Sequence, residues 1–227
     1  MKHVITWGLI VLMGGLVTQV WAGENDWVRK AYYKSYDYAR TQSYRPAIRA
    51  MLPVHKQYPK GYTVNLRLGW LYYLAGLYAD SIRHYQTAME AAPESVEAML
   101  GMTLPLMAKQ QFGQVELICN RLVYKDYYNI VGSVRLAWSL RKQGKLALGL
   151  KVTERLLVRH PTNVSLLTEQ GQILHAMGKK QAALHLFDDL LTLDPENSTA
   201  LKALNDLDQR LKLDDIKIKV TKKGGKL

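Results

Sequence analysis

The sequence has a single cysteine and lacks the motifs of catalytic and metal sites. Cys119 has no second thiol to pair with, which excludes an intramolecular disulfide framework. The 227 residues contain no HExxH, no zinc-type Cys/His spacing, no G-x-S-x-G, no Walker loop and no G-x-G-x-x-G. Catalysis needs a nucleophile, a base or a metal held in fixed geometry. We therefore expect no enzyme activity, no cofactor and no metal ion.

Cys119 falls on the inward-facing stripe of an expected helix. The favoured interpretation is a buried small hydrophobic residue, and a reactive thiol is the alternative.

Acidic residues are scarce relative to basic ones. The chain has 19 Asp and Glu against 31 Lys and Arg, for a formal net charge of +12. Such a charge suits binding to an anionic polymer or a membrane surface, or is the surface of a soluble cationic protein without such a partner. Nucleic acid is not expected as a partner, because the N-terminal segment indicates export.

Residues 1–22 have the pattern of a secretory signal. Lys2 and His3 form a short basic start, residues 4–17 are mostly apolar, and a small residue, Ala22, ends the segment. The apolar run is short and interrupted by glycines, which disfavours a permanent membrane span. We expect a cleaved signal peptide, with an uncleaved inner-membrane anchor as the alternative. Both place the rest of the chain across the membrane, and the single cysteine favours a bacterial periplasm.

Residues 62–93 carry a helix–turn–helix pattern. Gly69 allows two helices to approach, Gly76 supplies the turn between them, and Tyr85 and Ala88 give the second helix an apolar stripe that Pro93 ends. With Leu68-Gly69 and Tyr72, this stretch resembles the W-x2-L-G-x2-Y…A-x3-F…P pattern of the tetratricopeptide repeat, a 34-residue unit. The resemblance implies an all-α fold, an α-solenoid of helix–turn–helix repeats.

The 34-residue frame extends in both directions without an insertion. Five units result, at residues 28–61, 62–95, 96–129, 130–163 and 164–197. The third unit is the most degenerate, because it lacks the glycines equivalent to Gly69 and Gly76. Pro105 inside its first helix predicts a kink. Pro53 predicts the same in the second helix of the first unit.

A capping helix is expected after the last unit. Leu201, Leu204, Leu207 and Leu211 form an apolar stripe over residues 198–212, and a repeat stack needs a terminal element with a polar outer face. The solenoid therefore covers residues 23–212. We expect residues 213–227 to form a basic flexible tail, which either adds a strand to a partner's sheet edge or stays solvated without a partner.

The resemblance also implies where a partner would bind, because the first helix of each such unit lines a concave groove. The residues at the groove positions are aromatic, aliphatic and basic. They are Arg29, Tyr32, Tyr36, Arg40, Leu66, Trp70, Tyr73, Leu104, Met107, Trp138, Arg141 and Lys142. Aromatic and Arg side chains most often carry interface energy. The alternative is that neighbouring units bury these rings in the core.

The sequence thus predicts a non-enzymatic protein–protein interaction scaffold of a bacterial cell-envelope assembly. It would bind a segment of another envelope protein in the aromatic groove. The alternative is a cationic protein that binds an anionic envelope polymer or a membrane surface through its basic body and tail. Salt discriminates between them, since electrostatic binding weakens steeply with ionic strength.

Overall fold

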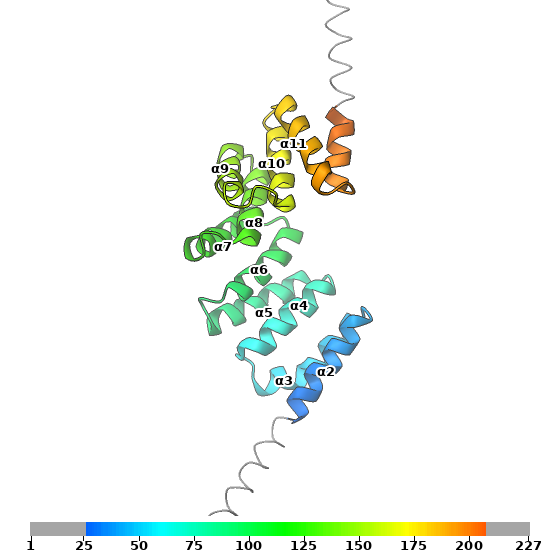
Figure 1. Ribbon diagram of the computed structural model, residues 1–227. Coiled ribbons are helices and arrows are strands. Elements are labelled where there is room, and N and C mark those ends of the chain that lie inside the picture. Colours follow the sequence, from blue (N-terminus) through cyan, green and yellow to red (C-terminus); the bar gives the residue numbers. More distant parts are fainter. Residues whose placement is uncertain (1–25, 208–227) are drawn as a thin grey trace, which may run out of the picture. The chain divides into compact units, whose positions relative to one another are not determined.

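The computed structural model describes residues 26–207, and all regular structure in that range is helical. The helices are α2 (Asp26–Arg40), α3 (Tyr44–Gln57), α4 (Tyr62–Leu74), α5 (Tyr78–Ala91), α6 (Val96–Ala108), α7 (Phe112–Lys125), α8 (Ile130–Lys142), α9 (Leu146–Leu157), α10 (Val164–Ala176) and α11 (Lys180–Leu193) (Figure 1). A further helix starts at residue 198 and is followed to residue 207. Within residues 26–207 no helix is long and apolar enough to span a bilayer.

The helices repeat with the predicted period. In repeats two to five the first helix begins at residues 62, 96, 130 and 164, and the second begins at 78, 112, 146 and 180. Each start is therefore 34 residues after the equivalent one, which confirms the all-α repeat architecture. The predicted signal segment, residues 208–212 of the predicted cap and the basic tail lie outside the described residues.

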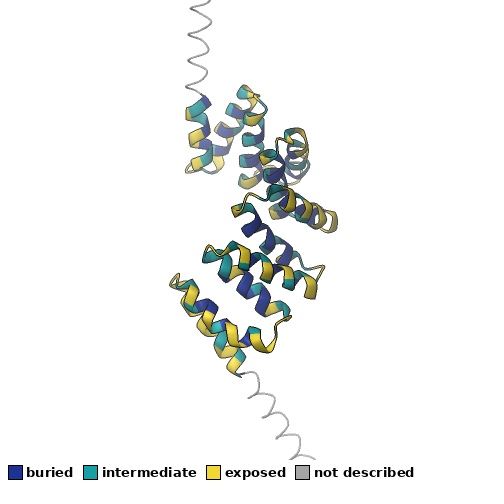
Figure 2. Cartoon of the chain, turned by 180° about the vertical axis from the view of Figure 1, so that it is seen from behind, coloured by how far each residue is buried: buried dark blue, intermediate teal, exposed yellow. Residues whose placement is uncertain are grey.

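The described residues form two compact units, 26–105 and 106–207, with the boundary at Pro105. In the first, α3 packs on α2 and α4, and α4 packs on α5. In the second, α8 packs on α7, α9 and α10, and α10 packs on α9 and α11. Buried residues lie on the helix faces that meet, and exposed residues lie on the outer faces (Figure 2).

In four of the five repeats the last residue caps the next helix through its side chain, and the exception is Gly61. The side-chain oxygens of Asn129, Asn163 and Asn197 accept hydrogen bonds from the backbone N–H three residues later, at 2.8, 3.1 and 3.0 Å. Ser95 accepts in the same way from Ala98, at 3.1 Å. These bonds satisfy donors that a helix start leaves without partners, so they fix where these four helices begin.

An aromatic ring of the second helix packs against a glycine of the first. A Cβ atom on Gly69 would lie 2.8 Å from Tyr85 Cγ, and one on Gly171 would lie 2.5 Å from Phe187 Cε1. Tyr85 also faces Gly101 on α6, where a Cβ would lie 2.3 Å from Cε1. Such contacts are closer than a side chain allows, which confirms the predicted role of Gly69.

The helix that begins at residue 198 covers the apolar side of the last pair, as a cap does. Ala200, Ala203 and Leu207 are buried with Phe187 and Leu190 in one core cluster. The predicted stripe is wrong at Leu201, which is 49% exposed. Leu204 and Leu207 of that stripe do pack in this core, and Ala200 and Ala203 are buried beside them. Cys119 is buried, as favoured above, and burial raises the pKa of its thiol to about 12.

The turn between paired helices needs a left-handed residue in every repeat. Glycine occupies this position in three repeats, with φ of +74° at Gly76, +76° at Gly144 and +74° at Gly178. In the first and third repeats the same position holds Gln42 and Gln110, with φ of 57° and 56°. A residue with a side chain is disfavoured by about 1–2 kcal/mol in this conformation.

Replacing Gln110 by Gly should therefore stabilise the fold, by up to about 1 kcal/mol once the larger backbone entropy of glycine is subtracted. Thermal unfolding followed by circular dichroism would show a higher Tm for Gln110→Gly. The reciprocal change, Gly144→Gln, should lower Tm. A Gln110→Gly protein with an unchanged or lower Tm would contradict this account of the turn.

His84 is a partly buried histidine of the compact unit 26–105, and it is neutral at pH 7. Its Nδ1 lies 2.8 Å from Asn65 Oδ1, while the Asn65 amide donates to the carbonyls of Pro59 and Gly61, so His84 is the donor. Its ring stacks on Tyr72 at 5.1 Å and meets the edge of His55 at 5.0 Å. Burial, together with the neighbouring His55 and Arg83, lowers the pKa of His84 from 6.5 to about 4.

Stability should fall as the pH is lowered through the window from about 6.5 to about 4, because only the unfolded chain binds a proton at residue 84 there. The loss should be roughly 1–2 kcal/mol, allowing for solvent that still reaches the ring. Chemical denaturation at several pH values measures it. His84→Gln should flatten this dependence, and His185→Gln, a change of an exposed histidine on α11, should leave it as in the parent.

Candidate functional site

The predicted groove residues of α2 lie on the exposed side of the first unit. Arg29 is held by Asp26 at 2.7 Å, and Arg40 pairs with Asp37, both within the helix. Tyr36 is exposed, whereas Tyr32 is partly buried and packs on the core formed by α3 and α4. The two arginines of α2 are therefore positioned by carboxylates one turn away.

The residue that connects α2 to α4 is Arg67, which the sequence reading did not select. Its guanidinium carbon lies 3.8 Å from the centre of the Tyr36 ring, and its Nε donates to Ser35 Oγ at 2.8 Å. Arg67 is only 9% exposed, and burial lowers the pKa of its guanidinium. The cation holds the Tyr36 ring in place.

Three rings follow one another along the face formed by α4 and the start of α5. Trp70 and Tyr73 are 5.6 Å apart between ring centres, and Tyr73 and Tyr78 are 6.1 Å apart. Trp70 is 38% exposed, so the ring is accessible while its edge is supported by Tyr73. Leu66 on α4, and Leu104 and Met107 on α6, are partly buried. The alternative of complete burial does not hold for Trp70.

The second unit contains a cavity of about 940 Å³ between α8, α10 and the helix that begins at residue 198. Its lining combines one aromatic ring with basic and polar side chains. The lining residues are Trp138, Arg141, Lys142, Gln172, His175, Ala176, Ser198, Thr199, Lys202, Ala203 and Asp206. The structure thus brings together the three groove residues predicted on α8.

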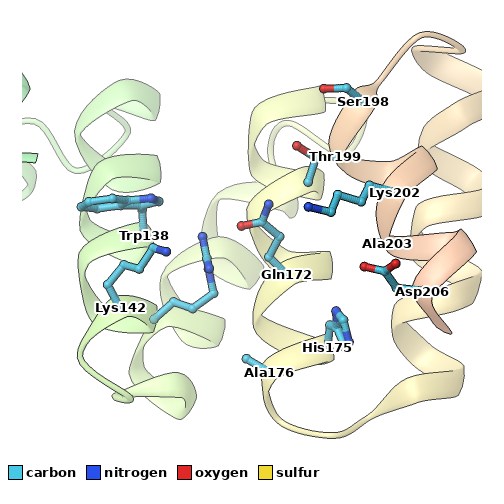
Figure 3. A pocket seen from close by; sticks show the side chains of 11 residues that line it. Trp138, Lys142, Gln172, His175, Ala176, Ser198, Thr199, Lys202, Ala203 and Asp206 are labelled. Atoms are coloured by element: carbon cyan, nitrogen blue, oxygen red, sulfur yellow. The ribbon is translucent and has the colours of Figure 1, made fainter. Parts of the chain in front are cut away.

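Lys142 and Lys202 reach into this cavity from opposite sides, and Gln172 and His175 line the wall between them (Figure 3). The Trp138 ring is supported from behind by Phe112, with 5.2 Å between ring centres in a T-shaped contact. Its other neighbour is the Lys142 ammonium, 6.0 Å from the ring centre. Phe112 thus holds the Trp138 ring, and the Lys142 cation lies near that ring.

Arg141 is fixed by a buried ion pair. Its Nε and Nη2 donate to the two carboxylate oxygens of Glu169 at 2.6 and 3.1 Å. The side chains are 15% and 7% exposed. Burial raises the pKa of Glu169, and the hydrogen bonds and charge of Arg141 offset part of that rise. Arg141 was predicted as a groove residue, and its charge is balanced by Glu169 within the fold.

The remaining charges of the cavity are Lys142 and Lys202 against Asp206. The cavity is therefore cationic, with hydroxyl and amide groups that can bond a peptide backbone and an indole that can cover an apolar side chain. The final helix contributes Ser198, Thr199, Lys202, Ala203 and Asp206, and the sequence reading gave it only a capping role. Their spacing of three and four residues placed them on one helical face, which was the available signal.

No group of three or more His, Cys, Asp or Glu side chains among residues 26–207 could hold a metal ion.

A family model for the tetratricopeptide repeat matches residues 34–100 and 134–202, which is more than half of the chain. The chain belongs to the tetratricopeptide repeat family. Members of this family typically act as protein–protein interaction modules, and the fold of this chain is that of such a scaffold. A comparison with curated proteins gives no significant match.

Several solved structures share the fold. A crystal structure of MamA is 16% identical, with a TM-score of 0.66 over 77% of this chain and 95% of that one. MamA from Desulfovibrio magneticus RS-1, from residue 41 to the end, is 13% identical, with a TM-score of 0.69 over 76% and 98%. YrrB, described as a repeat protein with an unusual peptide-binding site, is 14% identical, with a TM-score of 0.65 over 82% and 96%. At these identities the likeness concerns the fold.

The Arg141–Glu169 pair should be essential for the shape of the second unit. Glu169→Gln leaves a buried guanidinium without its counter-charge and should destabilise the fold by about 3 kcal/mol, measured by urea denaturation. Adding Arg141→Met to Glu169→Gln removes the unpaired charge and should recover part of the loss. The losses of Glu169→Gln alone and Arg141→Met alone should sum to more than the loss of the double variant. A double variant whose loss equals that sum would contradict a direct pairing.

Proposed function

We propose that this protein is a non-enzymatic scaffold of the bacterial cell envelope that binds a short segment of a partner protein. The observation that carries the proposal is the cavity of the second unit, where Lys142 lies near the Trp138 ring and Lys202 reaches in from the opposite side (Figure 3). Its volume of about 940 Å³ is at the upper end of the range of about 300–1,000 Å³ for ligand pockets. That volume suits a few peptide residues.

The lining indicates the chemistry of the segment. Lys142 and Lys202 favour an acidic side chain, and Trp138 favours an apolar or aromatic one next to it. Gln172 and Thr199 offer donors and acceptors for the backbone of an extended peptide. A segment that alternates acidic and apolar residues fits this arrangement.

The first unit offers a second contact surface, formed by Tyr36, Trp70, Tyr73 and Tyr78. Its rings are held by neighbours, by Arg67 under Tyr36 and by Tyr73 beside Trp70. Rigid aromatic side chains lose little conformational entropy on binding, so they are efficient anchors. The peptide-binding site named for YrrB provides a precedent for this use of the fold.

The envelope part of the proposal rests on residues 1–22, whose basic start, apolar stretch and final Ala22 have the order of a secretory signal. An exported scaffold would meet other exported proteins. The competing function is binding of an anionic polymer or membrane surface, for which the net charge of +12 is the argument.

Selection of random peptides displayed on phage, against the full-length chain, should enrich sequences with an acidic residue next to an aromatic or aliphatic one. Trp138→Ala and Lys202→Glu should each weaken binding of a selected peptide by about tenfold or more, measured by isothermal titration calorimetry. The helical circular dichroism signal should be retained. Raising the salt concentration should weaken binding only modestly, whereas a polymer-binding protein would lose it steeply.

Two substitutions outside the cavity serve as controls. Tyr124→Ala removes an exposed aromatic on α7, and Lys151→Glu reverses an exposed charge on α9. Both should leave peptide binding unchanged. In cells, a photo-reactive amino acid in place of Gln172 should crosslink to an exported protein. Crosslinks to cytosolic proteins alone would refute the envelope assignment. A Trp138→Ala protein that binds the peptide as tightly as the parent would refute the role of the cavity in binding.

A further inference from the structure

A second pocket of the 106–207 unit lies apart from the Trp138 cavity and shares no lining residue with it. It has a volume of about 360 Å³ and is lined by Tyr127, Tyr128, Arg155, Val158 and Arg159. The tyrosines are in the turn before α8, and the arginines flank the end of α9. Nothing in the proposed peptide-binding function uses this pocket.

The two arginines are arranged as a pair. The guanidinium carbon of Arg155 lies 4.1 Å from the centre of the Tyr127 ring, and that of Arg159 lies 4.3 Å from the centre of the Tyr128 ring. The tyrosine rings pack edge to face with 5.1 Å between centres. Each guanidinium therefore has one face covered by a ring, which orients its N–H groups in the plane of the fork.

The positive charge of this pair is not balanced within the described chain. Neither Arg155 nor Arg159 forms an ion pair with a carboxylate among residues 26–207. Among the acidic residues, Glu154 is adjacent to Arg155 in the sequence and is exposed, and Asp126 is adjacent to Tyr127 and accepts from the Asn129 amide at 3.0 Å. Arg141 of the same unit, in contrast, has Glu169 as a bidentate partner.

Arg155 also has donors without partners. Its Nε and Nη2 are buried, and neither has a hydrogen-bond acceptor in the described residues. A buried donor without an acceptor costs about 1–3 kcal/mol, and more when it is charged, so folded proteins rarely leave one in place without a reason. An acceptor oxygen would remove this cost if the Arg155 side chain turned these two buried atoms toward the pocket.

We propose that the Tyr127–Tyr128–Arg155–Arg159 pocket binds a phosphate group. Planar guanidinium forks match the oxygens of phosphate, and two of them match the charge of about −1.5 to −2 that a phosphate monoester carries at pH 7. The volume of about 360 Å³ leaves space for part of the group that bears the phosphate. This site is independent of peptide binding in the Trp138 cavity.

The test follows the arginine Nε–H resonances of the full-length chain by NMR during titration with inorganic phosphate and with glycerol phosphate, at physiological salt. We expect saturable shifts of the Arg155 and Arg159 signals. Arg155→Lys keeps the charge but loses the planar fork, and should weaken binding by about tenfold. Arg159→Gln, at an exposed position, should weaken it similarly. Lys151→Gln, which removes a charge from α9 outside the pocket, should change affinity less than about twofold.

Vesicles of phosphatidylcholine with phosphatidic acid, compared with phosphatidylcholine alone, identify the source of the phosphate. Co-sedimentation that depends on Arg155 indicates a lipid headgroup, and binding of soluble phosphates alone indicates a free or peptide-borne one. Acetate binding as tightly as phosphate would overturn the assignment. So would the absence of saturable shifts, an equal loss in Lys151→Gln, or an Arg155→Lys protein that loses only thermal stability.

Discussion

The close contact between a glycine of the first helix and an aromatic ring of the second sets the geometry of the fold. Tyr85 against Gly69 and Phe187 against Gly171 fix how near the paired helices lie and at which level they meet. Trp70 comes directly after Gly69 and lies on the exposed side of α4. A repeat fold gains stability from such contacts within pairs and between neighbouring pairs.

Polar groups decide what the second unit presents. The Arg141–Glu169 pair satisfies its own charges, so the cavity keeps Lys142 and Lys202 for a partner. At the other pocket the balance is different, because Arg155 and Arg159 are stacked on tyrosines without a carboxylate. Arginine thus has a structural role at position 141 and is available to a ligand at positions 155 and 159. The difference lies in whether the fold supplies the counter-charge.

Much of the architecture could be predicted from the sequence, since Gly69, Gly76, Pro93 and the 34-residue phase each have a local physical meaning. The sites were less predictable. Arg67 is buried because Tyr36 and Ser35 of another helix cover it, and no local pattern signals this. Leu201 was expected inside as part of an apolar stripe, whereas Ala200 and Ala203 are buried and Leu201 is exposed. Gln42 and Gln110 carry no sign of a left-handed turn apart from their position in the repeat.

The asparagine caps have a consequence for how a chain of this kind can change length. Asn129, Asn163 and Asn197 each close one repeat and start the next helix, so the residues 130–163 and 164–197 are each bounded on both sides by the same joint. A duplication of either segment would begin after an asparagine and end on one, and every helix in the longer chain would still be capped. Gain or loss of a whole repeat is therefore open to a gene duplication or deletion without repair at the junction, and the reach of the scaffold can vary in steps of one unit.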